Sequence, residues 1–178
     1  LHIVPGLWKI DGYTAIARSL AQHYQLKRGE NYFEFPYDWR RSNGVAARRL
    51  ARESARWLQR WRRSSGHADA KLIFLAHSMG GLVVRWFTEC LEGWRDTRML
   101  VSFGTPYRGS LNAVDFICNG MKKSVGPIEL IDLTALLRSM SSVYQLLPIY
   151  PCIDAGDGKL QRAAEVKGIA QIDAARAQ

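Results

Sequence analysis

The chain has 178 residues, 47% of them hydrophobic and 23% charged, which suffices for one globular domain with a substantial core and is unlike a disordered chain. No apolar run reaches the roughly 20 residues of a membrane-spanning helix, and the three scattered cysteines lack the spacing of a metal site or a disulfide framework. The net charge of +9 would attract an anionic lipid surface or nucleic acid, yet it carries no information about the fold.

The first predicted element is a short strand at residues 1–4, which ends at the turn residues Pro5 and Gly6. Asp11 can cap the helix that follows. Helical spacing of apolar residues predicts four buried positions on this helix: Tyr13, Ile16, Ala17 and Leu20. Because the sequence opens inside an apolar segment and without methionine, we expect that an upstream piece has been removed.

Residues 31–39 are rich in aromatic side chains and predict a second strand, whose hydrogen-bond ladder would end at Pro36. Asp38, Trp39 and Arg40 follow at its carboxyl end, the edge at which open α/β sheets bind ligands. A charged pair that closes a strand is more often structural than catalytic, so Asp38 and Arg40 receive no role in the chemistry.

A long helix is predicted over residues 44–63, capped by Ser42 or Asn43. Its apolar face would contain Ala46, Leu50, Trp57, Leu58 and Trp61. Its other face carries seven arginines: Arg48, Arg49, Arg52, Arg56, Arg60, Arg62 and Arg63. A solvated helix surface is the commoner explanation, and docking on an anionic membrane is the alternative. No recognition motif accompanies the charge, so we expect no nucleic-acid binding.

The most informative segment is residues 71–85. Residues 72–76 form an unbroken apolar run, which is typical of a strand buried on both faces of a parallel sheet. The sequence Ala-His-Ser-Met-Gly follows at residues 76–80, and an apolar helix begins after it. Small residues two positions before and after Ser78 allow a sharp strand-to-helix turn that holds the hydroxyl clear of the sheet.

This context predicts that Ser78 is the nucleophile of an α/β-hydrolase-type site. Gly81 would let the helix pack closely against the strands. The buried face of that helix would contain Leu82, Val83, Trp86 and Phe87. His77 adjoins the serine, but neighbours on a tight turn point in different directions, and the base of this fold comes later in the chain.

Another strand is predicted at residues 98–103, and the loop at residues 104–110 should open on the ligand edge, one strand over from Ser78. The alternation of strands and helices predicts an α/β-hydrolase-type doubly wound, mostly parallel sheet with helices on both faces. We expect one partial domain: a sheet core at residues 1–112, a lid-like helical segment at 113–151, and a tail at 152–178 that is weakly helical from residue 159.

Residues 132–148 have apolar side chains at intervals of three and four, which predicts one amphipathic helix. Such a helix could be a lid over Ser78, and Tyr107, Leu136 and Met140 would then line an acyl-chain pocket. An ordinary core-packing helix explains the same pattern equally well.

Three blocks of sequence carry a family resemblance. Residues 35–40 read Phe-Pro-Tyr-Asp-Trp-Arg, residues 77–81 read His-Ser-Met-Gly-Gly, and residues 104–110 contain Gly-Thr-Pro and Gly-Ser. Together they resemble the lecithin:cholesterol acyltransferase family, in particular its bacterial lipase/acyltransferase-like members, over nearly the whole chain. The resemblance implies an α/β-hydrolase fold and acyl transfer from an ester, usually a lipid, to water or to another hydroxyl.

Within this resemblance, Ser78 matches the nucleophile and Met79 matches the oxyanion donor through its backbone N–H. The second oxyanion donor of the family lies at an earlier Pro-Gly turn, for which Leu7 is the candidate in this sequence. Residues 1–13 look more like a second Pro-Gly segment that precedes the Tyr-Asp-Trp-Arg block, so we expect the true oxyanion strand to lie upstream.

The catalytic triad of this fold follows the order Ser, Asp or Glu, His, and none of the four histidines lies after Ser78. Either the acid and base lie beyond Gln178 in a longer protein, or the chain is a degenerate hydrolase. The incomplete start and unclosed end favour the first. No triad acid is assigned among the aspartates that follow the serine: Asp115, Asp132, Asp154 and Asp157.

We therefore expect a serine-dependent lipase, esterase or acyltransferase that forms an acyl-enzyme on Ser78 and uses no metal or organic cofactor. The competing hypothesis is a non-catalytic hydrolase-like module that docks on an anionic membrane or partner through the arginine face. The location is open, with a cytoplasmic or membrane-peripheral one favoured, and the oligomeric state is not predicted.

Overall fold

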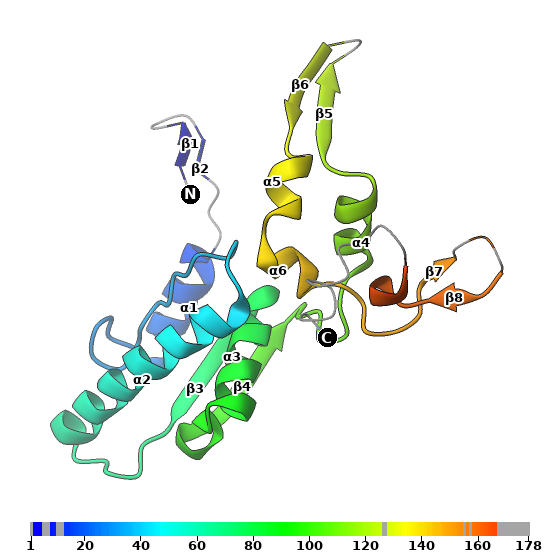
Figure 1. The fold of residues 1–178 in the computed structure, drawn as a ribbon. Coiled ribbons are helices and arrows are strands. Elements are labelled where there is room, and N and C mark those ends of the chain that lie inside the picture. Colours follow the sequence, from blue (N-terminus) through cyan, green and yellow to red (C-terminus); the bar gives the residue numbers. More distant parts are fainter. Residues whose placement is uncertain are drawn as a thin grey trace. The chain divides into compact units, whose positions relative to one another are not determined.

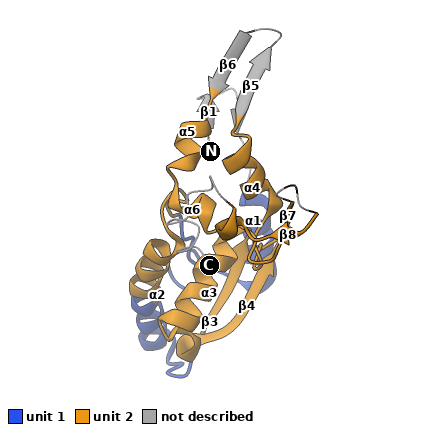
Figure 2. Ribbon diagram, turned by 45° about the vertical axis from the view of Figure 1, so that its right-hand side comes forward, with its two compact units in different colours: residues 1–36, 55–70 blue, residues 37–54, 71–178 orange. Residues whose placement is uncertain are grey.

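The computed structural model describes residues 2–4, 8–9, 13–125, 128–154, 156 and 158–166 (Figure 1). The chain divides into two compact units (Figure 2). One contains Leu1–Pro36 and Ala55–Ala70, and the other contains Tyr37–Ser54 and Lys71–Gln178. The expected boundaries at residues 112 and 151 stay a prediction.

The first unit begins with an antiparallel hairpin of β1 (His2–Val4) and β2 (Trp8–Lys9). The predicted first strand is thus confirmed, and it pairs with this second short strand. Helix α1 (Thr14–Tyr24) follows as expected. The predicted turn and cap residues lie outside the described residues: Pro5, Gly6 and Asp11.

The prediction that α1 buries its apolar face is wrong. Tyr13 is 62% exposed and Ile16 is 45% exposed, while Ala17 and Leu20 are half-buried. Periodicity shows only that one face of a helix is apolar, and burial needs a surface packed against that face. The spacing therefore predicted the helix correctly and its packing incorrectly.

Helix α2 (Asn43–Ser65) confirms the long helix. Ala46, Leu50 and Leu58 are buried as expected, whereas Trp57 and Trp61 are half-buried. The Ser42 hydroxyl accepts a hydrogen bond from Gly44 N at 3.3 Å, so Ser42 acts as the cap.

The aromatic segment at residues 31–39 is not a strand, contrary to the prediction. It contains one isolated bridge, at Tyr32, and no ladder. Phe33 stacks on Trp57 of α2 with ring centroids 4.6 Å apart, and Phe35 meets the same ring edge-on at 6.5 Å. These aromatic side chains pack against a helix, and strand propensity could not distinguish that use from a place in a sheet.

The second unit contains a parallel pair of strands, β3 (Leu72–His77) and β4 (Thr97–Phe103), as predicted. Helix α3 (Met79–Cys90) and the 3-10 helix η1 (Gly93–Asp96) connect them. Among the described residues every other sheet is a two-stranded antiparallel hairpin, so this parallel pair is the only part of the predicted doubly wound sheet that those residues contain.

The prediction that β3 is buried on both faces is wrong. Ile73 is 58% exposed and Leu75 is 47% exposed, whereas Phe74 meets Phe87 of α3 edge-on with ring centroids 5.6 Å apart. One face of the strand is therefore covered and the other is not, as side-chain alternation along a pleated strand allows.

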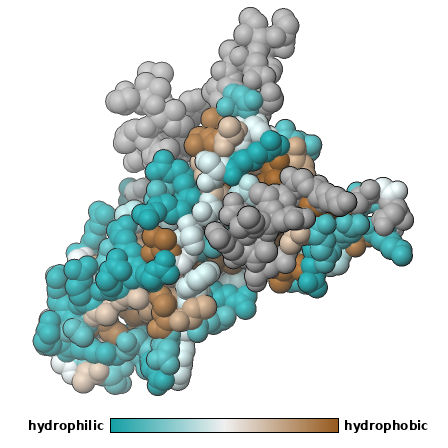
Figure 3. Space-filling model, viewed as in Figure 1, coloured by the Kyte–Doolittle hydropathy of each residue, from teal (hydrophilic) through white to brown (hydrophobic). Residues whose placement is uncertain are grey.

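Hydrophobic residues also reach the surface elsewhere, as brown areas among teal ones in Figure 3. On α3, Val83 and Phe87 are buried as predicted, while Leu82 and Trp86 are half-buried. Met79, Gly81 and Val84 are buried as well, so the helix buries a face different from the one that the sequence suggested.

Beyond β4 the second unit consists of short elements. They are α4 (Leu111–Cys118), β5 (Lys122–Val125), β6 (Ile128–Asp132), α5 (Thr134–Arg138), α6 (Ser141–Tyr144), β7 (Ile153–Asp154), β8 (Leu160–Gln161) and the 3-10 helix η2 (Ala163–Glu165). The weak helix predicted from residue 159 is wrong where the structure describes it, because β8 and η2 occupy that part. Residues 167–178 lie outside the described residues.

The single helix predicted over residues 132–148 is also wrong. Asp132 ends strand β6, and its Oδ1 atom accepts a hydrogen bond from Thr134 N at 2.8 Å, which starts α5 at that point. Met140 then adopts an extended backbone, with φ −89° and ψ 116°, between α5 and α6. Two short helices in succession give the same spacing of apolar residues as one long helix, so the spacing could not distinguish them.

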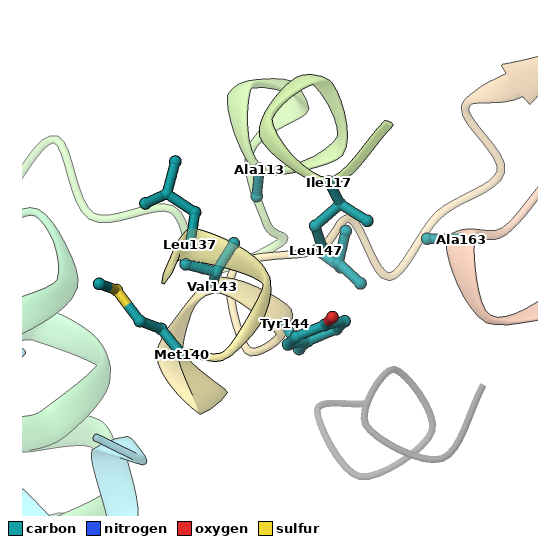
Figure 4. Close-up of a cluster of buried hydrophobic side chains, with 8 residues drawn as sticks. All are labelled: Ala113, Ile117, Leu137, Met140, Val143, Tyr144, Leu147 and Ala163. Carbon is teal, nitrogen blue, oxygen red and sulfur yellow. The ribbon is translucent and has the colours of Figure 1, made fainter. Parts of the chain in front are cut away.

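Most apolar residues of this segment form a buried cluster (Figure 4). Its members are Ala113, Ile117, Leu137, Met140, Val143, Tyr144, Leu147 and Ala163. Core packing therefore accounts for Met140, which is only 5% exposed, whereas the lid over Ser78 stays a prediction.

We expect Leu137→Ala to lower the free energy of unfolding by about 2–5 kcal/mol, because Leu137 is buried in this cluster. The matched control is Leu136→Ala, one residue earlier on α5, where the side chain is 51% exposed and the change should stay within about 0.5 kcal/mol. Urea unfolding of both variants measures the difference, and equal losses would contradict this description of the core.

Candidate functional site

The turn between β3 and α3 holds Ser78 in an uncommon backbone conformation. Its φ is 51° and its ψ is −128°, in a region that residues other than glycine rarely occupy. Such a conformation costs about 1–3 kcal/mol and persists only when its surroundings impose it. The sharp strand-to-helix turn predicted from the sequence is therefore present, and Ser78 is exposed.

Hydrogen bonds fix both the N–H and the carbonyl oxygen of the Ser78 backbone, and two of the partners lie at or just after the end of β4. The Ser78 N–H donates to Phe103 O at 2.8 Å, next to the parallel pairing of His77 with Phe103. The Ser78 carbonyl oxygen accepts two hydrogen bonds, from Gly81 N at 3.1 Å and from Thr105 Oγ1 at 2.9 Å. Both polar groups of the Ser78 backbone are satisfied, which offsets part of the strain.

Gly81 is required by the same contact. A Cβ atom at Gly81 would collide with the side chain of Thr105. At Gly80 a Cβ atom would lie 3.9 Å from Ala76 Cβ and 3.9 Å from the Tyr37 hydroxyl, which are ordinary van der Waals distances. Gly81 therefore allows a close contact, but the partner is Thr105 of the loop after β4 and not a residue of the strands, as the sequence had suggested.

The Tyr-Asp-Trp-Arg block lies beside this turn, since the Tyr37 hydroxyl is close to the backbone at Gly80. Helix α2 begins just after the block. A Cβ atom at Gly44 would lie 3.0 Å from the Trp86 ring of α3, so the first turn of α2 packs tightly against α3. The block and the serine, distant in sequence, are thus neighbours in space.

Asp38 and Arg40 of this block form a two-point ion pair. Arg40 Nε donates to Asp38 Oδ1 at 2.7 Å and Arg40 Nη2 donates to Asp38 Oδ2 at 3.0 Å. This hydrogen bonding lowers the pKa of Asp38 from its ordinary value. A carboxylate with a lowered pKa is a poor proton acceptor, which agrees with a structural use of the pair.

The loop between β4 and α4 is held by the segment that follows α6. Ser110 N donates to Leu146 O at 2.7 Å, and Ile149 N donates to Arg108 O at 3.1 Å. A Cβ atom at Gly109, whose φ is 91°, would collide with the facing backbone of that segment. The loop that carries Thr105 is therefore fixed from the far side as well.

Gln145 connects that segment to the start of α2. Its Oε1 atom accepts a hydrogen bond from Asn43 N at 2.7 Å, and its Nε2 atom donates to Ser42 Oγ at 3.1 Å. Sequence reasoning missed both Gln145 and Thr105. No local pattern marks Gln145, whereas the Gly-Thr-Pro block could have directed attention to Thr105.

The two predicted oxyanion donors have different outcomes. Met79 follows Ser78 directly and is the first residue of α3, where backbone N–H groups have no partner within the helix. Its position is compatible with the predicted role, which stays a prediction. Leu7 lies outside the described residues.

The predicted substrate-lining residues do not gather at one place that the structure defines. Tyr107 is half-buried in the loop after β4, with the Arg85 guanidinium 5.6 Å from its ring centroid. Leu136 is exposed, and Met140 is in the buried cluster of the second unit. Their contact with an acyl chain stays a prediction.

Within the described parts of the chain, no group of three or more His, Cys, Asp or Glu side chains could hold a metal ion. The helices of those parts also include none that is both long and apolar enough to span a membrane.

Comparisons with known proteins agree on one family. The sequence model of lecithin:cholesterol acyltransferase matches residues 8–169. The chain is 27% identical to a lysosomal phospholipase A and acyltransferase of Bos taurus over 131 residues, which cover 68% of this chain and 30% of the relative. It is 28% identical to the Homo sapiens protein of the same name over 130 residues, 68% of this chain and 29% of the relative. The matched part is thus less than a third of either relative.

We expect Gly81→Ala to destabilise the second unit by about 1–3 kcal/mol, because the added methyl group must displace Thr105. Gly80→Ala is the matched control. It adds the same methyl group one residue earlier in α3, where there is room, and alanine favours a helix by up to about 1 kcal/mol. Thermal or urea unfolding of the two variants checks the expectation, which fails if Gly80→Ala is the more harmful change.

Proposed function

The chain belongs to the lecithin:cholesterol acyltransferase family, and on that premise we propose that the protein transfers acyl groups from a lipid ester to water or to another hydroxyl through Ser78. The family match covers residues 8–169 and includes all three sequence blocks that carry the resemblance. The names of the relatives, phospholipase A and acyltransferase, support a lipid ester as the acyl donor.

The observation that carries the proposal is the conformation of Ser78. An exposed serine at φ 51°, between a strand and a helix, is held in a strained turn by hydrogen bonds to both its N–H and its carbonyl oxygen. Strain of this kind is typical of functional positions, because a stable core gains nothing from it.

In the proposed first step, Ser78 Oγ attacks the ester carbonyl carbon and loses its proton to a base. The Met79 N–H stabilises the negative charge that develops on the carbonyl oxygen. The carbon–oxygen bond to the alcohol then breaks, the alcohol leaves with a proton, and the acyl group stays on Ser78 as an ester. In the second step, water or an acceptor alcohol attacks this ester and restores the serine hydroxyl.

The proposal assigns the nucleophile and one oxyanion donor to these residues and assigns no base. No histidine follows Ser78, and His77 ends strand β3 in parallel register with Phe103. A serine hydroxyl without a base is a weak nucleophile, so activity depends on the residues that supply one. Whether water or an alcohol accepts the acyl group depends on which reaches the acyl-enzyme first.

The test is intact-mass analysis after treatment with a fluorophosphonate, on the 178-residue chain and on the protein expressed from its complete reading frame. We expect one adduct on the latter, because Ser78 Oγ displaces fluoride from phosphorus. The Ser78→Ala variant should gain none. A folded protein that is never labelled, or labelling that survives Ser78→Ala, would overturn the proposal.

The arginine face of α2 supports a second proposal, that the protein docks on an anionic lipid surface. Five of the seven arginines are exposed and form no ion pair with any residue that the structure describes: Arg48, Arg52, Arg56, Arg60 and Arg63. The one acidic residue of the helix, Glu53, pairs with Arg49 at 2.6 Å. Near an anionic membrane each such arginine contributes about 1 kcal/mol of attraction.

We expect the protein to bind phosphatidylglycerol vesicles and not phosphatidylcholine vesicles, and to be released as the salt concentration rises, since salt screens surface charge. The double variant Arg48→Glu, Arg52→Glu should bind the vesicles at least tenfold more weakly, as measured by vesicle sedimentation. Arg98→Glu on β4 is the control, because it changes an exposed arginine outside α2. If Arg98→Glu weakens binding as much as either α2 substitution does alone, the effect comes from net charge and not from the arginine face. Binding without labelling of Ser78 would favour the non-catalytic module.

A further inference from the structure

We propose that Thr105 is a positioning residue that aims the Met79 backbone N–H at the oxyanion, acting through the Ser78–Met79 peptide group. This inference rests on the proposed function, because it assigns a role in the same acyl-transfer step. Thr105 would act on the oxyanion indirectly, through its hydrogen bond to the Ser78 carbonyl oxygen.

The planarity of the peptide group connects the two atoms. The carbonyl of Ser78 and the N–H of Met79 belong to one rigid plane, and in a trans peptide they point in opposite directions. A donor that fixes the direction of the carbonyl therefore also fixes the direction of the N–H. Thr105 Oγ1 is such a donor, at 2.9 Å from the Ser78 oxygen.

The second donor to the same oxygen does not make Thr105 redundant. Gly81 N donates at 3.1 Å from within the first turn of α3, so it moves with the helix that carries Met79. Thr105 reaches the oxygen from the loop after β4. It is therefore the contact that fixes the peptide plane relative to the strands, and a carbonyl oxygen with two lone pairs can accept both hydrogen bonds.

The hydroxyl of Thr105 is itself well fixed. Its side chain lies against Gly81 so closely that no methyl group fits between them. The loop is held beyond it by the backbone hydrogen bonds of Arg108 and Ser110 to the segment after α6. A branched side chain has few rotamers, which keeps the hydroxyl in one place. Donation to a carbonyl also polarises the peptide group and strengthens its N–H as a donor.

A purely structural role for Thr105 makes a different prediction, and two substitutions separate the roles. Thr105→Val keeps the shape that packs on Gly81 and removes the hydroxyl. Thr105→Ser keeps the hydroxyl and removes the methyl group. If Thr105 only fills space, Val is the milder change, and if it aims the N–H, Ser is.

The experiment measures kcat and KM for a soluble p-nitrophenyl ester, and the rate of fluorophosphonate labelling of Ser78, on the protein from its complete reading frame. We expect Thr105→Val to lower kcat and the labelling rate about 10- to 100-fold, somewhat less than the effect of losing an oxyanion donor outright. KM should stay within about twofold, because the change acts on the transition state. Thr105→Ser should keep at least a third of the wild-type kcat.

The outcomes keep the two proposals apart. If wild type is labelled and Thr105→Val reacts at the wild-type rate, the inference is wrong while the proposed function stands. The same holds if folded Thr105→Ser loses tenfold or more, a result that remains decisive even where the valine variant does not fold. If wild type is neither labelled nor active, the proposed function itself fails.

Discussion

The site depends on keeping one serine backbone at a positive φ. Ser78 can hold this conformation because hydrogen bonds reach its backbone from three residues: Phe103, Gly81 and Thr105. Two of these lie at or just after the end of β4, so the parallel pairing of β3 with β4 does more than form a sheet. It brings the groups that stabilise the turn to the edge where the turn occurs. The strain of one residue is thus supported by contacts of several.

The loop that stabilises this turn is itself fixed by segments that are distant from it in the sequence. The loop after β4 is hydrogen-bonded to the segment after α6, and Gln145 of that segment binds the start of α2 at Ser42 and Asn43. The first turn of α2 in turn packs on Trp86 of α3. These contacts form a closed ring of segments around the turn. The segment after α6 is itself anchored, because Leu147 belongs to the buried apolar cluster.

The sequence predicted the parts of this arrangement that local patterns encode. The strands β3 and β4, helices α2 and α3 and the turn at Ser78 each follow from residues adjacent in the chain. It failed where the outcome depends on what packs against an element. Ile73 and Leu75 are exposed although their strand is apolar, and Phe33 packs on a helix although its segment suits a strand. In the sequence Thr105 is visible only as part of the Gly-Thr-Pro motif, because its contact with Gly81 is one that no local pattern reveals.

The shared space between Gly81 and Thr105 also constrains how the sequence can change. A larger residue at position 81 meets the Thr105 side chain, so it should cost less stability once position 105 carries a smaller side chain. Residues in direct contact do not contribute independently to stability. The two positions should therefore be epistatic, and the order of substitutions would matter. If Thr105 changed first, the protein would lose a hydrogen bond to the Ser78 carbonyl oxygen before position 81 could accept a larger residue.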